Sequence, residues 1–267
     1  GLHGASVMLE FPSVGATENL LMAAVAAEGT TLVENAAREP EIVDLANMLV
    51  AMGARVEGAG TSTIEVEGVP LSSLHPCEHT TVGDRIEAGT FLAGGALMGG
   101  PVTVRGIDPS FLRMALMKLQ AMGCDVQTGD GWITVARTGA LLPTDIQTLP
   151  HPGFPTDLQA QFMLLAARAE GSSVITENVF ENRFAHAAQL RCMGADIWAS
   201  GRMCLVRGGK LTGAKVAARD LRGGAALVLA GLAAEGVTEV EGAGLIDRGY
   251  EGLERMLGGL GARVERI

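Results

Sequence analysis

Apolar and polar positions along this chain repeat in the same order four times. Each copy opens on a glycine and continues with a short alternating run that is typical of a strand. A polar loop follows, and then an amphipathic helix that ends at a second glycine; the copies span residues 29–53, 100–123, 171–194 and 236–261. Because this period is too long for a solenoid repeat, each copy is interpreted as a sizeable α/β unit.

Each copy is preceded by a helix rich in small residues and followed by one or two more strand-like runs. In the first copy, the second helix carries apolar residues at helical spacing, namely Ile42, Leu45, Leu49 and Met52. The small-residue helices are apolar nearly all round, so we expect them to be buried inside. The pattern therefore predicts a unit of the form βαβαββ, with one inner and one outer helix.

Three such units around a pseudo-threefold axis would close a domain with helices within and sheets outside. We expect residues 80–267 to form one complete three-unit domain of this inside-out α/β barrel type. Residues 1–79 are then the last unit of a second, N-terminal domain, whose other units lie outside this sequence. Since the chain opens at Gly1 inside a repeat, we expect it to lack its natural N-terminus.

Composition narrows the function classes. Hydrophobic residues make up 48% of the chain and aromatic residues only 4%, which predicts a core of Ala, Leu, Val and Met. The net charge of −10 argues against a nucleic-acid surface. No apolar run reaches the ~20 residues that span a bilayer, and no signal peptide is recognised. We therefore expect a cytoplasmic protein without membrane insertion.

The cysteines indicate a reducing compartment, because none has CxxC spacing; they are Cys77, Cys124, Cys192 and Cys204. Cys124 and Cys192 lie beside helix ends, where we expect them to be buried as small hydrophobic residues. His75, Cys77 and His79 alternate and could bind a metal ion, but no second ligand cluster accompanies them. A surface connection between units is the preferred interpretation, and no metal or other cofactor is expected.

Polar motifs stand where the small-residue helices begin. They contain Ser13-Val14-Gly15, Asp84-Arg85, Thr156-Asp157 and Asp220-Leu221-Arg222. The loops before the second helices add Arg38, Asp108, Arg183 and Arg248. Helix N-termini bind anions, and arginines strengthen such sites. The set therefore predicts a polyanion site, although each acid alone could be a helix cap, Arg85 could pair with a neighbouring acid, and Arg183 could cover an aromatic ring.

The chain resembles the UDP-N-acetylglucosamine enolpyruvyl transferase family, also called UDP-N-acetylglucosamine 1-carboxyvinyltransferase. The resemblance is carried by ENAAREPEIVD (34–44), DRIEAGTF (84–91), FPTDLQAQF (154–162), ITENVFENRF (175–184), DLR (220–222) and IDRGY (246–250). It implies a transferase that moves the enolpyruvyl group of phosphoenolpyruvate to the 3-hydroxyl of UDP-N-acetylglucosamine and releases phosphate. This is the first committed step of peptidoglycan synthesis, and it requires no metal.

The same resemblance implies roles for individual residues. Asp157 matches the carboxylate that contacts the reacting hydroxyl and is the candidate base. Substrate contacts are implied for Ser13, Val14, Gly15, Val179, Arg183, Asp220, Arg222 and Arg248, and the equivalent helix start adds Arg85 as a candidate. The family's Lys-Asn motif and its loop with a Cys or Asp general acid would lie upstream of residue 1, so we expect this chain alone to be inactive.

Other functions stay open from the sequence. The chain could belong to a non-catalytic paralogue that keeps the sugar-nucleotide half-site, or to the related 3-phosphoshikimate 1-carboxyvinyltransferases. A structural repeat protein without a ligand is a third alternative. The presence of Asp157, Arg222 and Arg248 together disfavours that third alternative.

Overall fold

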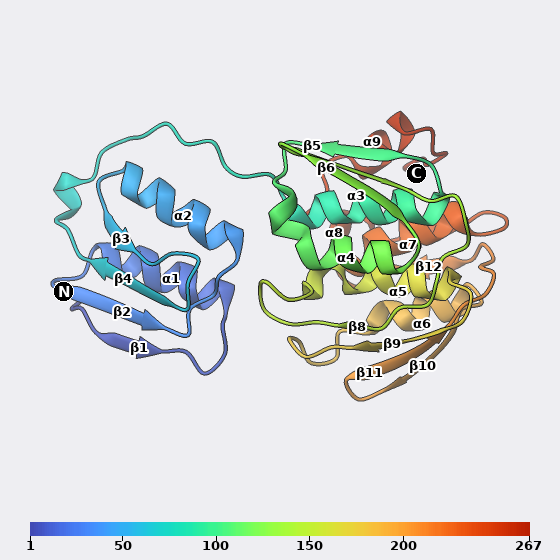
Figure 1. Cartoon of the computed structure of the whole chain (residues 1–267), viewed down its shortest axis with the longest axis horizontal. Helices are drawn as coiled ribbons and strands as arrows, with labels where there is room; N and C mark the ends of the chain where they lie inside the picture. The colour runs from blue at the N-terminus through green and yellow to red at the C-terminus, as the bar shows by residue number, and fades with distance from the viewer. The chain divides into compact units, whose positions relative to one another are not determined.

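All residues from Gly1 to Ile267 are described by a computed structural model, in which the chain divides into two units. The first unit comprises residues 1–82 with residues 150–152, and the second comprises residues 83–149 and 153–267 (Figure 1). Each unit has its own cluster of buried hydrophobic side chains. No helix in either unit has the length and apolar character needed to cross a membrane.

The first unit folds as one βαβαββ repeat, as predicted. Its strand order is β1-β2-β4-β3, with β1 parallel to β2 and β4 antiparallel to both β2 and β3. The elements are β1 (Ser6–Met8), α1 (Val14–Val25), β2 (Thr30–Glu34), α2 (Pro40–Ala51), β3 (Arg55–Glu57), β4 (Thr63–Glu67) and the 3-10 helix η1 (Leu71–Ser73).

One face of this sheet is covered by its helices. Ile64 and Val66 of β4 are fully buried, whereas Glu65 between them is exposed, which is the alternation of a strand with one covered face. Leu21 of α1 and Ile42 of α2 belong to the same buried cluster. The predicted apolar stripe of the second helix therefore faces the core of the first unit.

The second unit begins with a repeat that has three strands rather than four. It contains α3 (Arg85–Met98), β5 (Val102–Arg105), η2 (Pro109–Leu112), α4 (Arg113–Ala121), β6 (Asp125–Gly129) and β7 (Trp132–Ala136). The strand order is β5-β7-β6, and β7 is antiparallel to both neighbours. The strand expected before α3 is not formed.

The next repeat has the full predicted pattern. It contains β8 (Ile146–Gln147), η3 (Thr156–Leu158), α5 (Gln159–Arg168), β9 (Ser172–Thr176), α6 (Ala185–Cys192), β10 (Asp196–Ser200) and β11 (Met203–Arg207). The strand order is β10-β11-β9-β8, with β8 parallel to β9 and the other pairs antiparallel.

The last repeat has only two paired strands. It contains β12 (Lys215–Ala217), α7 (Leu221–Ala233), β13 (Glu239–Glu241), α8 (Ala243–Ile246) and α9 (Leu253–Gly259). β12 and β13 are parallel, and Lys215 on β12 pairs with Glu239 and Glu241 on β13. Residues 262–267 form no strand. The third repeat is thus less complete than predicted.

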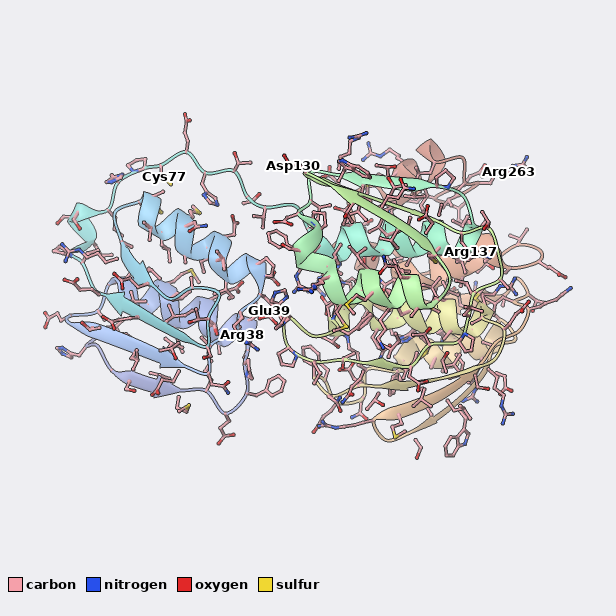
Figure 2. The ribbon with its side chains drawn as sticks, in the orientation of Figure 1. Arg38, Glu39, Cys77, Asp130, Arg137 and Arg263 are labelled. Atoms are coloured by element: carbon pink, nitrogen blue, oxygen red, sulfur yellow. The ribbon has the colours of Figure 1, made fainter.

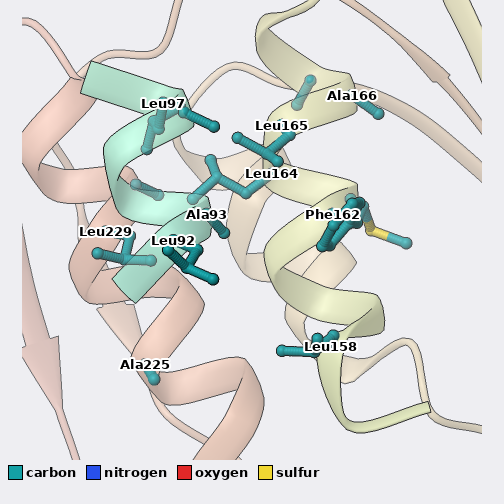
Figure 3. Packing of buried hydrophobic residues seen from close by; sticks show 14 of the residues in the cluster. Leu92, Ala93, Leu97, Leu158, Phe162, Leu164, Leu165, Ala166, Ala225 and Leu229 are labelled. Atoms are coloured by element: carbon teal, nitrogen blue, oxygen red, sulfur yellow. The ribbon is translucent and has the colours of Figure 1, made fainter. Parts of the chain in front are cut away.

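The small-residue helices α3, α5 and α7 contact one another inside the second unit, as Figure 3 shows for their buried side chains. Leu92, Phe162 and Leu229 come from these three helices and are at most 2% exposed. The close approach of η3 to α3 depends on glycine, since a methyl group on Gly89 would lie 2.6 Å from Cδ1 of Leu158. The predicted placement of these helices inside the repeats is confirmed for this unit.

The C-terminal end of α3 is closed by an arginine from the following sheet. Arg137, labelled in Figure 2, donates from Nε to the carbonyl of Ala96 at 2.7 Å and from Nη2 to that of Leu97 at 3.1 Å. A cation at this position also suits the negative end of the helix dipole. Arg137, the residue directly after β7, therefore links this strand to the C-terminal end of α3.

The four thiols are free, and their exposure partly differs from expectation. Cys124 and Cys204 are buried, whereas Cys192 is exposed and Cys77 is half-buried. The prediction that Cys192 is buried was therefore wrong. Leu190 and Met193 take the buried positions of this turn of α6, so that Cys192 between them faces solvent.

Candidate functional site

Three of the four predicted helix starts are capped by the side chain of their polar motif. The Ser13 hydroxyl accepts from the backbone N–H of Ala16 at the start of α1. Asp84 and Asp220 accept from the first N–H groups of α3 and α7. Capping thus explains these residues locally, but it does not explain Asp157.

Asp157 lies in η3 and makes ion pairs instead of a cap. Its Oδ1 is 2.7 Å from Nη2 of Arg183, and its Oδ2 is 3.2 Å from Nε of Arg222. Burial alone would raise the pKa of Asp157, but the two guanidinium groups outweigh burial and lower the pKa below its usual value. The structure therefore brings three predicted site residues from separate elements together around one carboxylate.

Arg222 follows the first residue of α7 and is the more deeply held of the two arginines. Its guanidinium lies over the ring of Tyr250, with the central carbon 5.2 Å from the ring centre. Its Nη1 atom is buried and has no hydrogen-bond partner. Burial would lower the pKa of Arg222, but Tyr250, Asp157 and Asp84 together raise it. Arg222 is therefore a charged group with one buried donor that no protein atom satisfies.

Arg183 is fixed on two sides in addition to its ion pair. Its guanidinium lies 4.8 Å from the centre of the Phe180 ring, so the aromatic contact considered from sequence is formed together with the ion pair. Its Nη1 atom donates to the hydroxyl of Thr156 at 2.8 Å. Arg183 therefore links the loop after β9 to both residues that open η3.

The N-terminus of α7 adds backbone N–H groups near this cluster. Asp220 Oδ1 accepts from the N–H groups of Arg222 at 3.0 Å and Gly223 at 2.8 Å. A methyl group on Gly223 would lie 3.1 Å from Cβ of His186, which packs against this helix start. Burial lowers the pKa of His186 to about 4, so its imidazole is neutral at pH 7, and its Nε2 is unpartnered.

The remaining predicted residues lie at other positions of their own units. Val179 donates its backbone N–H to Glu177 at 2.9 Å, and Arg85 is the first residue of α3. Arg248 is exposed in the segment between α8 and α9, where its neighbour Asp247 pairs with Arg266. The predicted residues of the first unit open α1, namely Ser13, Val14 and Gly15.

Sequence reasoning missed the buried polar groups beneath the cluster. Tyr250 Oη lies 2.8 Å from Oγ1 of Thr90, and Gln161 donates to both. Glu177 is 1% exposed and accepts several hydrogen bonds. Glu177 did leave a signal, because an acidic residue there continues the alternate, buried positions of β9 and must be satisfied internally.

The alternating His-Cys-His motif does not converge on one point. His79 Nε2 lies 2.9 Å from Oδ1 of Asp44, and Cys77, labelled in Figure 2, has its sulfur 3.9 Å from the carbonyl of Met48. His75 Nδ1 lies 3.2 Å from the carbonyl of Pro76. No group of three or more His, Cys, Asp or Glu side chains is arranged to hold a metal ion.

Comparisons with known proteins identify similar chains. Residues 1–257 match the family model described as EPSP synthase (3-phosphoshikimate 1-carboxyvinyltransferase). The chain is 54% identical over 267 residues to the UDP-N-acetylglucosamine 1-carboxyvinyltransferase of Nitratidesulfovibrio vulgaris strain Hildenborough, covering 99% of this chain and 64% of that protein. The enzyme of the same name from Psychrobacter sp. strain PRwf-1 is 51% identical, over 100% of this chain and 61% of that protein. The chain therefore spans less than two thirds of the length of these relatives.

Solved structures show the same fold. The crystal structure of the enolpyruvyl transferase NikO from Streptomyces tendae matches with a TM-score of 0.88 and 29% identity, over 98% of this chain and 65% of that one. An EPSP synthase from Acinetobacter baumannii matches with a TM-score of 0.70 at 21% identity, over 96% of this chain and 62% of that one. The second likeness concerns the fold alone.

Proposed function

We propose that this chain serves enolpyruvyl transfer to UDP-N-acetylglucosamine. The chain belongs to the EPSP synthase (3-phosphoshikimate 1-carboxyvinyltransferase) family and, within it, to the UDP-N-acetylglucosamine 1-carboxyvinyltransferases. The reaction moves the enolpyruvyl group of phosphoenolpyruvate to the 3-hydroxyl of the sugar and releases phosphate. It is the first committed step of bacterial peptidoglycan synthesis, a cytoplasmic process.

One observation supports this proposal most directly: a carboxylate lies between two arginines beside the start of a buried helix. Phosphoenolpyruvate carries a phosphate and a carboxylate on a small molecule, so its site needs several cationic donors. Arg183 and Arg222 supply two guanidinium groups, and Nη1 of Arg222 has no partner within the protein. The N-terminus of α7 adds a favourable dipole.

We propose that Asp157 acts as the base toward the 3-hydroxyl. In the free chain, Arg183 and Arg222 keep its pKa low, which makes it a weak base. An anionic substrate that binds these arginines would withdraw part of their positive charge from Asp157 and so raise its pKa. Substrate binding would thus strengthen the base only when the reactants are in place.

The chemical steps follow from this assignment. As Asp157 takes the hydroxyl proton, the oxygen forms a bond to C2 of phosphoenolpyruvate, and C3 receives a proton from a general acid. Loss of a proton from C3 then expels phosphate and restores the double bond as an enol ether. The general acid is assigned to no residue of this chain.

The remaining roles follow the family resemblance. Ser13, Val14 and Gly15 are proposed to contact the uridine diphosphate at the start of α1, where a methyl group on Gly15 would meet no atom within 4 Å. Roles in substrate binding are also proposed for Arg85, Val179, Asp220 and Arg248. In this proposal, residues 1–79 are the last unit of an N-terminal catalytic domain, and residues 80–267 are the C-terminal domain.

Phosphate release tests the proposal in two forms of the protein. The chain is assayed alone and as a chimera extended by the part of the Nitratidesulfovibrio vulgaris relative that it does not match. We expect turnover with phosphoenolpyruvate and UDP-N-acetylglucosamine in the chimera, and little or none in the chain alone. Turnover with 3-phosphoshikimate in place of UDP-N-acetylglucosamine would show that 3-phosphoshikimate is the acceptor. Binding of UDP-N-acetylglucosamine without turnover would support the non-catalytic alternative.

A further inference from the structure

Glu177 is a fully buried acid that the proposed chemistry does not use. It follows β9 directly, on the buried register of Ser173 and Ile175, and is 1% exposed. A buried carboxylate is costly unless its oxygens accept hydrogen bonds. The hydrogen bonds to the Glu177 carboxylate therefore show how the cost of its burial is offset.

Glu177 accepts five hydrogen bonds, all of them from neutral donors. Oε1 accepts from Thr148 Oγ1 at 2.7 Å, Val179 N at 2.9 Å and Phe180 N at 3.0 Å. Oε2 accepts from Thr156 Oγ1 at 2.9 Å and Gln159 Nε2 at 3.4 Å. An ionised carboxylate only accepts hydrogen bonds, so these donors match that form. The bonds join the end of β8, the residues of η3 and the start of α5, and the loop after β9.

The hydrogen bond from Thr156 has a directional consequence. A threonine hydroxyl has one proton, and here that proton is directed to Glu177. Its oxygen lone pairs are therefore left for Arg183, whose Nη1 donates to Thr156 at 2.8 Å. Nη2 of the same guanidinium lies 2.7 Å from Oδ1 of Asp157. A continuous path of three contacts thus runs from Glu177 to Asp157.

We propose that Glu177 is a positioning residue for Asp157. It directs the hydroxyl of Thr156, which orients the guanidinium of Arg183, and Arg183 in turn holds the carboxylate of Asp157. The importance of this path for catalysis rests on the proposed function, in which Asp157 is the base. The path itself depends only on the contacts in the folded chain.

The charges around Asp157 make the path measurable. Its carboxylate faces Arg183 from the loop after β9 and Arg222 from α7, while Asp84 and Tyr250 act on Arg222. Of the two arginines, Arg183 is the one that donates a hydrogen bond to Thr156. A change in the titration of Asp157 after substitution along the path therefore reports on Arg183.

The test is a carbon-13 NMR titration of the Asp157 carboxyl in the 267-residue chain, without substrate. In Glu177→Gln, the amide N–H groups can face the Thr156 oxygen, so that the hydroxyl proton turns toward Arg183 and opposes its donor. We expect the titration midpoint of Asp157 to move to higher pH, because one of its two cationic partners is displaced. An unchanged midpoint in a folded Glu177→Gln variant would overturn the proposal.

Matched variants separate positioning from general destabilisation. Thr156→Val removes the middle of the path and should give the same upward shift, whereas Thr156→Ser keeps the hydroxyl and should restore the original midpoint. Thr148→Val removes a hydrogen bond to Glu177 that does not lead to Arg183. It should lower the melting temperature and leave the Asp157 midpoint unchanged.

Two results from these variants would also overturn the proposal. One is an Asp157 titration midpoint in Thr156→Val that equals that of the parent chain. The other is a shift of this midpoint in Thr148→Val as large as that in Thr156→Val. The Thr156 pair decides the question if Glu177→Gln does not fold. Because no substrate is present, the result is independent of turnover. A chimera without activity would refute the proposed function but leave the path from Glu177 to Asp157 intact. An unchanged titration midpoint of Asp157 would refute the path but leave the proposed function intact.

Discussion

Nη2 of Arg183 lies 2.7 Å from Oδ1 of Asp157, and this ion pair joins the loop after β9 to the turn that precedes α5. The pair is partly exposed, with 33% of the Asp157 side chain accessible. Pairs in contact with solvent contribute only about 0–1 kcal/mol to stability. The arrangement is therefore better explained by the charge it places on the proposed ligand site than by folding.

Asp157→Asn separates these two explanations. In the extended chimera, we expect turnover to fall on the order of 10²–10⁴-fold, as for the loss of a positioned base. The thermal unfolding of the chain should change little. Asp108→Asn is the matched control, because Asp108 only caps η2 by accepting from Ser110 and asparagine caps equally well. A large fall in melting temperature with turnover kept within a few-fold would make Asp157 a structural residue.

His186 should make stability depend on pH. Burial lowers its pKa to about 4 in the folded chain, against about 6.5 when unfolded. Between these pH values the unfolded chain binds a proton that the folded chain does not. The free energy of unfolding should therefore decrease as the pH falls from about 6.5 to 4, by roughly 3 kcal/mol in total.

Urea unfolding at several pH values checks this expectation. His186→Gln should flatten the dependence in that interval, whereas His3→Gln should not, because the His3 side chain is 72% exposed. Equal slopes in the parent and His186→Gln would show that the histidine is not held neutral.

Gly224→Ala should destabilise the second unit. The added methyl group would lie 2.7 Å from Cγ1 of Ile246 and 2.9 Å from Cβ of Ala218, and overpacking of this kind costs about 1–3 kcal/mol. Gly258→Ala, in α9, is the matched control because no atom lies within 4 Å of its new methyl group. It should be neutral or stabilise the helix by about 0.5–1 kcal/mol. Thermal melts that rank the two variants in the opposite order would contradict the packing of α7.

The thiols should differ sharply in reactivity toward iodoacetamide near pH 8. Cys192 is exposed, so it should be alkylated in the native chain. Burial raises the pKa of Cys204 to about 12 and also raises that of Cys124, so both should react only after unfolding, since the thiolate is the nucleophile. Peptide mass spectrometry over time gives the order, and Cys192→Ser should remove the early modification. Early labelling of Cys204 would contradict its burial.

The sequence was sufficient to predict the full strand-and-helix pattern of two of the four repeats and the polar residues at the starts of the small-residue helices. Local patterns carry this information, because apolar spacing and a capping residue act within one element. The grouping of Asp157, Arg183 and Arg222 also followed from the expectation that equivalent loops converge. Their individual functional roles remain predictions.

The partners of these residues could not be predicted from the sequence in the same way. Glu177, directly after β9, and Thr156 of η3 are joined by a hydrogen bond, and nothing within either segment specifies the other. Tyr250 likewise forms hydrogen bonds with Thr90 and Gln161, which lie on two different helices, α3 and α5. Such contacts depend on tertiary packing. The strands expected from residues 262–267 are likewise not formed.

The ion pairs of Lys215 with Glu239 and Glu241 have a consequence beyond the fold of one molecule. They lie on the two-stranded sheet of β12 and β13, where both outer edges carry backbone groups without a strand partner. Such edges can recruit a strand from another molecule, and charged side chains discourage that pairing. The lysine and glutamates at this sheet are at least 49% exposed, and their charges disfavour edge-to-edge pairing between copies of this chain.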